Sequence, residues 1–116
     1  MSHENTIELI SLALDASLMR QTAIANNVAN ANTADYQTQT VNFEQQLMNA
    51  SPNLEADNEG ALKDIKPFYE LAPTQSSIDE QMALSVQNAT QFRALVKGLN
   101  LKFSIMKLAL QGNNQS

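Results

Sequence analysis

The chain has 116 residues, a formal net charge of −5, no cysteine, no tryptophan and 5% aromatic residues. Its length allows one small domain, and so few aromatic residues argue against a large close-packed core and favour an extended shape. The lack of cysteine excludes disulfides, thiol nucleophiles and cysteine-ligated zinc. No apolar run reaches the about 18 residues of a membrane span, and the N-terminus lacks the pattern of a cleaved secretory signal.

The first expected element is a helix from about Asn5 to Asn30. Its apolar residues fall into two rows rather than one, which predicts contacts on two sides of the helix. We expect one side to pair with the C-terminal helix and the other to remain available to neighbouring subunits. The first row is Ile7, Ile10, Leu14, Ile24 and Val28, and the second is Leu9, Leu12, Ala16, Met19 and Ala23.

The end of this helix carries an asparagine run that ordinary helix chemistry does not explain. Residues 25–36 read Ala-Asn-Asn-Val-Ala-Asn-Ala-Asn-Thr-Ala-Asp-Tyr, although asparagine disfavours helix interiors because its amide competes for backbone groups. The run resembles the N-terminal signature of the bacterial flagellar rod and hook family, except that Ala34 and Asp35 stand where that family has Pro-Gly. Asp35 tolerates the left-handed backbone of such a turn. The alternative is an Asn-rich helix end running into a loop.

We predict that this signature serves assembly more than the stability of the isolated subunit. Asn26 and Asn30 share a helix face and Asn27 is turned about 100° away, so a single partner helix cannot satisfy all three amides. The candidate subunit interface therefore includes Asn26, Asn27, Asn30, Asn32, Thr33 and Tyr36.

Residues 37–76 are expected to form an irregular connector between an N-terminal unit, residues 1–36, and a C-terminal unit, residues 77–116. A short helix is expected over residues 43–50. Pro67 to Pro73 should be extended, because each proline restricts its own φ and the residue before it. The polar, mostly acidic stretch 53–64 is typical of a flexible loop.

The strongest periodicity lies in the C-terminal unit, where residues alternate spacings of four and three. This heptad seam predicts a helix of about 34 residues packed against a partner helix. Ser77 and Glu80 form a capping box at its start, Gly112 is expected to end it, and Gly98 is expected to allow close approach of a neighbouring helix. The predicted fold is therefore all-α, with two long terminal helices in an antiparallel coiled-coil hairpin.

The seam consists of Ile78, Met82, Ser85, Ala89, Phe92, Val96, Leu99, Phe103, Met106 and Leu110. We expect Phe92 and Phe103 to anchor the packing between helices. The candidate subunit interface accordingly also includes Phe92, Val96, Leu99, Phe103, Met106 and Leu110.

Charge divides the chain into an acidic and a basic part. Residues 1–80 contain all 12 acids and three bases (3 − 12 = −9), whereas residues 81–116 contain four bases and no acid (+4). Four bases spread along one segment, without interleaved exposed aromatic residues, are a weak footprint for nucleic acid. The helix dipole and acidic neighbouring segments account for them more simply.

No set of residues supports catalysis. His3 is the single histidine and lies at the terminus, so a His-based triad or metal cluster has nothing to assemble around. Glu55, Asp57 and Glu59 alternate as in a calcium loop, but the glycine and terminal glutamate of an EF-hand are missing from their positions. We expect no enzyme activity, cofactor, metal, nucleic acid or small-molecule substrate.

The C-terminal unit is similar to the proximal rod members of the same flagellar family. The resemblance implies a structural subunit of the basal-body rod, which assembles with its own copies, other rod proteins and the gate-proximal rod adaptor into a tube that transmits torque and passes exported subunits. It also implies export through the flagellar type III apparatus without a cleaved signal peptide, and a periplasmic location in the basal body. The matching segments are the stretch from Met82-Ala83 through Gln87-Asn88, then Ala94-Leu95-Val96, Leu99, Lys102-Phe103, Met106-Lys107 and Ala109-Leu110-Gln111-Gly112.

Two alternatives remain open at this point. A sister proximal rod protein has the same N-terminal signature with a different C-terminal helix. A cytoplasmic helical-hairpin export chaperone or adaptor would share the heptads, acidity and small size, but it would not need the asparagine signature.

Overall fold

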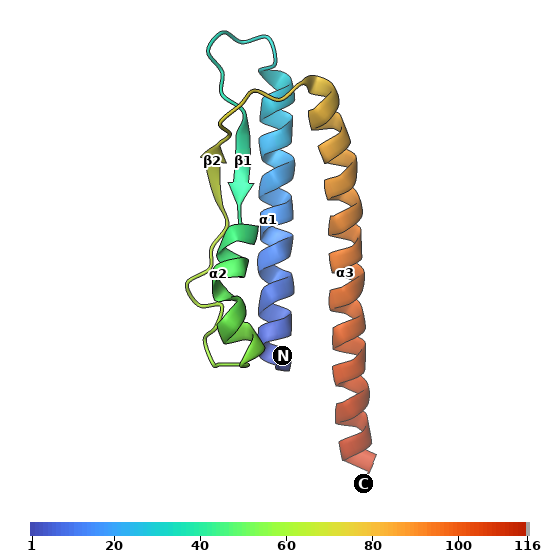
Figure 1. Cartoon of the computed structure of the whole chain (residues 1–116). Helices are drawn as coiled ribbons and strands as arrows, with labels where there is room; N and C mark the ends of the chain where they lie inside the picture. Colours follow the sequence, from blue (N-terminus) through green and yellow to red (C-terminus); the bar gives the residue numbers. More distant parts are fainter. Residues whose placement is uncertain (116) are drawn as a thin grey trace.

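The computed structural model describes residues 1–115 as a flat, elongated molecule of 66 × 26 × 14 Å. Its elements follow in the order α1 (His3–Ala29), β1 (Gln39–Asn42), α2 (Glu44–Glu55), β2 (Phe68–Leu71) and α3 (Ile78–Gln115). Helix α1 is central, with β1, β2 and α2 along one side of it and α3 along the other (Figure 1). The expected extended shape and the two long terminal helices are confirmed.

Local capping chemistry explains where both long helices begin. The Ser2 hydroxyl oxygen accepts the Asn5 N–H at 3.1 Å at the start of α1, and the Ser77 hydroxyl oxygen accepts the Glu80 N–H at 3.1 Å at the start of α3. The expected end at Gly112 is wrong, because α3 continues to Gln115. One glycine costs a helix about 1 kcal/mol relative to alanine, which is too little to stop a helix of this length.

Helices α1 and α3 run antiparallel. Asn27 bonds to Gln81, whereas Ser17, ten positions earlier on α1, bonds to Asn88, seven positions later on α3. Half-buried Ile7, Ile10 and Leu14 continue the same side of α1 as Ser17 toward its N-terminus. One of the two predicted rows therefore faces the C-terminal helix.

The other row of α1 is covered by the chain itself, which corrects the expectation that it faces neighbouring subunits. Ala16 and Ala23 are fully or almost fully buried, and they form the core together with buried residues of the connector. The core residues from the connector are Val41, Phe43, Leu62 and Ile65, and the half-buried residues packed on the core are Leu9, Leu12, Ala13, Met19, Leu47, Ala50 and Leu54.

The fold is mostly helical, as expected, but the connector contains a small two-stranded sheet and a helix, which corrects the expectation of an irregular connector in an all-α fold. Strands β1 and β2 pair antiparallel with Val41 opposite Tyr69, and the short helix expected after Phe43 is present as α2 and extends to Glu55. The extended conformation expected after Pro67 is present as β2. The pairing was missed because each strand has only four residues and finds its partner about 30 positions away, which leaves no local period to detect.

The predicted heptad seam is not a continuous apolar interface. Ser85, Phe92, Val96, Leu99 and Met106 are half-buried, but the other seam residues are exposed, and buried Gln81 and Asn88 face α1 instead. The exposed seam residues are Ile78, Met82, Ala89, Phe103 and Leu110. The two polar residues occupy these positions because α1 supplies hydrogen-bond partners, Asn27 for Gln81 and Ser17 and Gln21 for Asn88, which offset the cost of burying an amide.

Candidate assembly surface

Asn27 joins three segments of the subunit. Its Nδ2 donates to the Gln39 carbonyl and to Gln81 Oε1, both at 2.9 Å, and its Oδ1 accepts the Gln39 N–H and the Tyr36 hydroxyl, both at 2.8 Å. The side-chain amide therefore has two donated and two accepted bonds, which is its full capacity. Asn27 is 6% exposed, so its position inside the subunit differs from the assembly role that we expected.

A second polar contact joins α1 and α3 closer to the N-terminus of α1. Asn88 Nδ2 donates to the Ser17 carbonyl at 2.9 Å, and Asn88 Oδ1 accepts the Ser17 hydroxyl at 3.0 Å. Gln21 Nε2 donates to the Ser85 hydroxyl oxygen at 2.9 Å. Sequence reasoning missed this layer because it followed apolar residues only. The 4,3 spacing of Gln81, Ser85 and Asn88, with the same period as the seam, is the signal that could have identified it.

The remaining residues of the signature form an exposed corner after α1. Asn30 ends the helix, with its Nδ2 donating to the Asn26 carbonyl at 2.9 Å and its Oδ1 accepting the Thr33 hydroxyl at 3.1 Å. Asn26, Asn32 and Thr33 are exposed. Asn30 and Thr33 thus order the turn locally, while the corner itself stays accessible at one end of the molecule (Figure 1).

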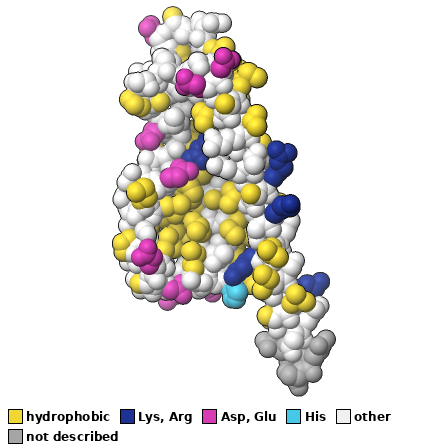
Figure 2. Space-filling model, turned by 45° about the vertical axis from the view of Figure 1, so that its right-hand side comes forward, with side chains coloured by type: hydrophobic (Ala, Val, Ile, Leu, Met, Phe, Trp, Pro, Cys, Tyr) yellow, Lys and Arg dark blue, Asp and Glu magenta, His cyan; other side chains and the backbone are white. Residues whose placement is uncertain are grey.

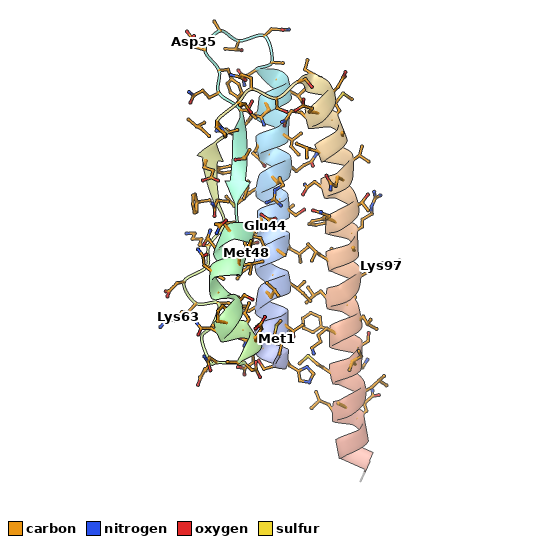
Figure 3. The ribbon with its side chains drawn as sticks, in the orientation of Figure 1. Met1, Asp35, Glu44, Met48, Lys63 and Lys97 are labelled. Atoms are coloured by element: carbon orange, nitrogen blue, oxygen red, sulfur yellow. The ribbon has the colours of Figure 1, made fainter. Side chains whose placement is uncertain are left out.

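Asp35 lies at the tip of this corner and has the left-handed backbone that the sequence led us to expect, with a φ of 61°. Figure 3 labels it at the far end of the loop after α1. A non-glycine residue pays roughly 1 kcal/mol or more for this conformation, although aspartate pays less than most.

We predict that Asp35→Val lowers the free energy of unfolding by about 1–2 kcal/mol, because a β-branched residue fits the left-handed region poorly. Asp35→Gly should change it by less than about 1 kcal/mol, since relief of strain is offset by the greater chain entropy of unfolded glycine. Urea denaturation of both variants measures the difference. Equal stability of the valine and glycine variants would contradict a strained left-handed turn.

The C-terminal part of α3 exposes large apolar side chains on more than one face. Phe103 is 48% exposed and Leu108 is 67% exposed, on different faces of the helix. A contiguous group of exposed large apolar side chains is typical of a site that contacts another protein. We call residues 101–112 the α3 end; its large exposed apolar residues are Leu101, Phe103, Ile105, Leu108 and Leu110. The structure therefore places Phe103 and Leu110 at the surface of the single chain.

The Lys and Arg side chains of α3 form no ion pair with an acidic side chain of the described residues. The one ion pair in residues 1–115 joins Arg20 to Glu44 at 2.8 Å, between α1 and α2. The helix dipole and acidic neighbouring segments therefore stay a prediction for what balances these bases, because no ion pair in the described chain involves them. Figure 2 shows Lys and Arg side chains along α3 and Asp and Glu side chains on the other side of the molecule. The bases in question are Arg93, Lys97, Lys102 and Lys107.

Asp57 fastens the beginning of α1 to the loop after α2. Its Oδ1 accepts the Ser2 N–H at 2.8 Å and the Asn5 side-chain amide at 3.1 Å. The Ser2 backbone hydrogen bond is the main cause that lowers the pKa of Asp57; the Asn5 amide and the N-terminal charge add to it, against some desolvation. The carboxylate form is thus the one that holds this contact.

We predict that this contact opens in acid. Because the folded pKa lies below the unfolded value of about 3.9, the stabilisation is complete above that value and is lost as the pH falls through the folded pKa. An NMR titration should show the Ser2 amide shifting with a midpoint below about 3.9, and Asp57→Asn should abolish that transition. A midpoint at or above the ordinary value would contradict the contact.

The described residues offer no group of three or more His, Asp and Glu side chains that could hold a metal ion. No helix among them is long and apolar enough to cross a membrane. What the surface does offer is the corner after α1, the apolar α3 end and separated charge, all of which suit contacts between proteins.

Comparison with known proteins points in the same direction. The chain is 28% identical to the flagellar basal body rod protein FlgB of Bacillus subtilis (strain 168), over an alignment that covers 92% of this chain and 94% of that protein. No family model matches the chain. The similarity covers both long helices and the connector between them, and it supports the resemblance to flagellar rod proteins.

Proposed function

We propose that this chain is a FlgB-type structural subunit of the bacterial flagellar basal-body rod. The observation that carries the proposal is a similarity that extends over nearly the whole length of both proteins. The asparagine signature at residues 25–36 also resembles the rod and hook family as a whole. The sister rod protein FlgC and a cytoplasmic export chaperone have no comparable support.

The finer proposal is a place in the proximal rod, where copies of the chain pack with other rod proteins and the gate-proximal adaptor into a tube. An apolar α3 end and an exposed corner at the opposite end of the molecule suit repeated contacts along such a tube. Export through the flagellar type III apparatus and a periplasmic location follow from this role. Asn27 is buried within the subunit and the half-buried Tyr36 bonds to it, which supports an interface formed by the other signature residues, Asn26, Asn30, Asn32 and Thr33.

Deletion of the gene in its own host tests the proposal. The expected result is a non-motile cell whose basal bodies lack a completed rod, with motility restored by the same gene on a plasmid. Cells that swim normally and build complete basal bodies without this chain would refute the proposed function.

The exposed corner can be tested separately with Asn30→Leu. We expect rods to fail, because Asn30 belongs to the proposed interface. The subunit should still be secreted, because Asn30 makes only local bonds within its turn. The matched control is Thr90→Leu, an exposed position on α3 away from the corner, which should leave rods intact. Normal rods with Asn30→Leu would exclude Asn30 from the interface.

A further inference from the structure

A groove runs along the molecule between the connector and α3, with α1 as its floor. Figure 2 shows an apolar hollow here, with acidic side chains at its connector side and basic side chains along α3. Two cavities of about 250 and 190 Å³ lie along its upper part and share Arg20 and Leu84 in their walls. We call this feature the α1 groove.

We propose that the α1 groove receives the α3 end of a second copy of this chain. This inference rests on the proposed function, and it names the surfaces through which copies would meet. The first argument is chemical. The α3 end exposes five large apolar side chains, and the α1 groove contains the apolar hollow seen in Figure 2. Contact between the α3 end of one copy and the α1 groove of another would remove the apolar surface of both from water, which favours association.

Charge complementarity is the second argument. The α3 end carries Lys102 and Lys107 and no acid. The connector contributes exposed Glu44, Glu55 and Asp57 to the molecule, and acidic side chains border the hollow on the connector side in Figure 2. A basic apolar helix that lies in the groove against its connector side would gain favourable contacts with these carboxylates, which the bases of α3 lack within the described chain.

Geometry selects a second copy over the same chain. Helix α3 is continuous from Ile78 to Gln115, so its end cannot fold back into the groove beside its own upper half. The α3 end projects past the N-terminus of α1, away from the body (Figure 1). A contact of end with groove joins two different surfaces, and such head-to-tail contacts build rings or helical arrays rather than closed two-fold dimers.

Cysteine cross-linking tests this contact directly, because the chain has no cysteine of its own. One copy carries Leu108→Cys in the α3 end, and a second copy, tagged to differ in mass, carries Gln91→Cys at the exposed wall of the groove. The mixed disulfide dimer is the expected product under oxidising conditions. The control pairs Leu108→Cys with Val86→Cys, which is 69% exposed on α3. Equal yields from both pairs would overturn the proposal.

Self-association of the full-length chain gives a second measurement. Leu108→Asp should raise the dissociation constant between copies about tenfold or more, as expected for one buried leucine lost from an interface. Val86→Asp should leave it unchanged. Circular dichroism checks that both variants stay helical. If Leu108→Asp associates as tightly as Val86→Asp, the α3 end does not carry the contact.

The two hypotheses fail differently. If deletion of the gene stops rod assembly but Leu108→Asp restores rods as well as the unaltered chain does, the groove contact is wrong and the rod function stands. If deletion leaves motility intact, the rod function is wrong whatever the cross-linking shows.

Discussion

Asn27→Leu is expected to lower the free energy of unfolding of the isolated chain by about 3 kcal/mol or more. The substitution removes four hydrogen bonds and leaves the Gln39 backbone N–H, the Gln81 amide oxygen and the Tyr36 hydroxyl to find other partners in a largely buried place. Each buried polar group left unsatisfied costs roughly 1–3 kcal/mol. Urea denaturation followed by circular dichroism measures the loss.

The neighbouring residue is a matched control. Asn26 is exposed, and its one side-chain bond, to Gln39 Oε1, is 3.4 Å long. Asn26→Leu should therefore change the free energy of unfolding by no more than about 0.5 kcal/mol. If the two leucine variants are equally stable, the buried amide does not hold α1, β1 and α3 together as the structure indicates.

Phe43→Ala is expected to be the most destabilising single change in the connector, at about 3–5 kcal/mol. Phe43 is 4% exposed and lies between β1 and α2, where its ring joins Val41 and the buried Leu62 in the core on α1. Truncation would leave a cavity in this core, and the short elements around it, β1, β2 and α2, could shift to fill it only in part. Thermal unfolding should show a clearly lower midpoint.

Phe103→Ala provides the contrast, and it revises an expectation drawn from periodicity. The ring is 48% exposed, so its loss should cost the isolated chain less than about 1 kcal/mol. A large loss of stability from Phe103→Ala in the isolated chain would show that the α3 end packs more tightly within the chain than its exposure indicates. A small loss, combined with defective assembly, would place the ring between subunits.

Most predictions that depend on neighbouring residues in the sequence succeeded, although the expected end of the C-terminal helix at Gly112 did not. The C-terminal helix begins at the predicted cap, where the Ser77 hydroxyl oxygen accepts the Glu80 N–H, and the first helix begins two residues before the expected Asn5, after Ser2. The left-handed turn at Asp35 follows from the tolerance of aspartate for positive φ. These features lie within one or two turns of chain, where the residues that interact are known without the fold.

The two-stranded sheet was decided by the tertiary structure. Residues 39–42 and 68–71 are too short to show a convincing period of two, and they pair because β1 lies against α1 and gives β2 an edge. The same face of α1 that looked available to neighbouring subunits is the one that this connector covers. Periodicity shows that a face is apolar, but it does not identify the element that buries it.

Asparagine illustrates the same limit at a single side chain. The sequence by itself determined that Asn27 points away from the helix face shared by Asn26 and Asn30, because helical geometry is local. Only the tertiary structure decided that Asn27 is buried among β1, Tyr36 and α3 while Asn26 faces solvent. An amide is satisfied equally by water, by its own backbone or by a distant segment, so its partner depends on which segments the fold brings within about 3 Å.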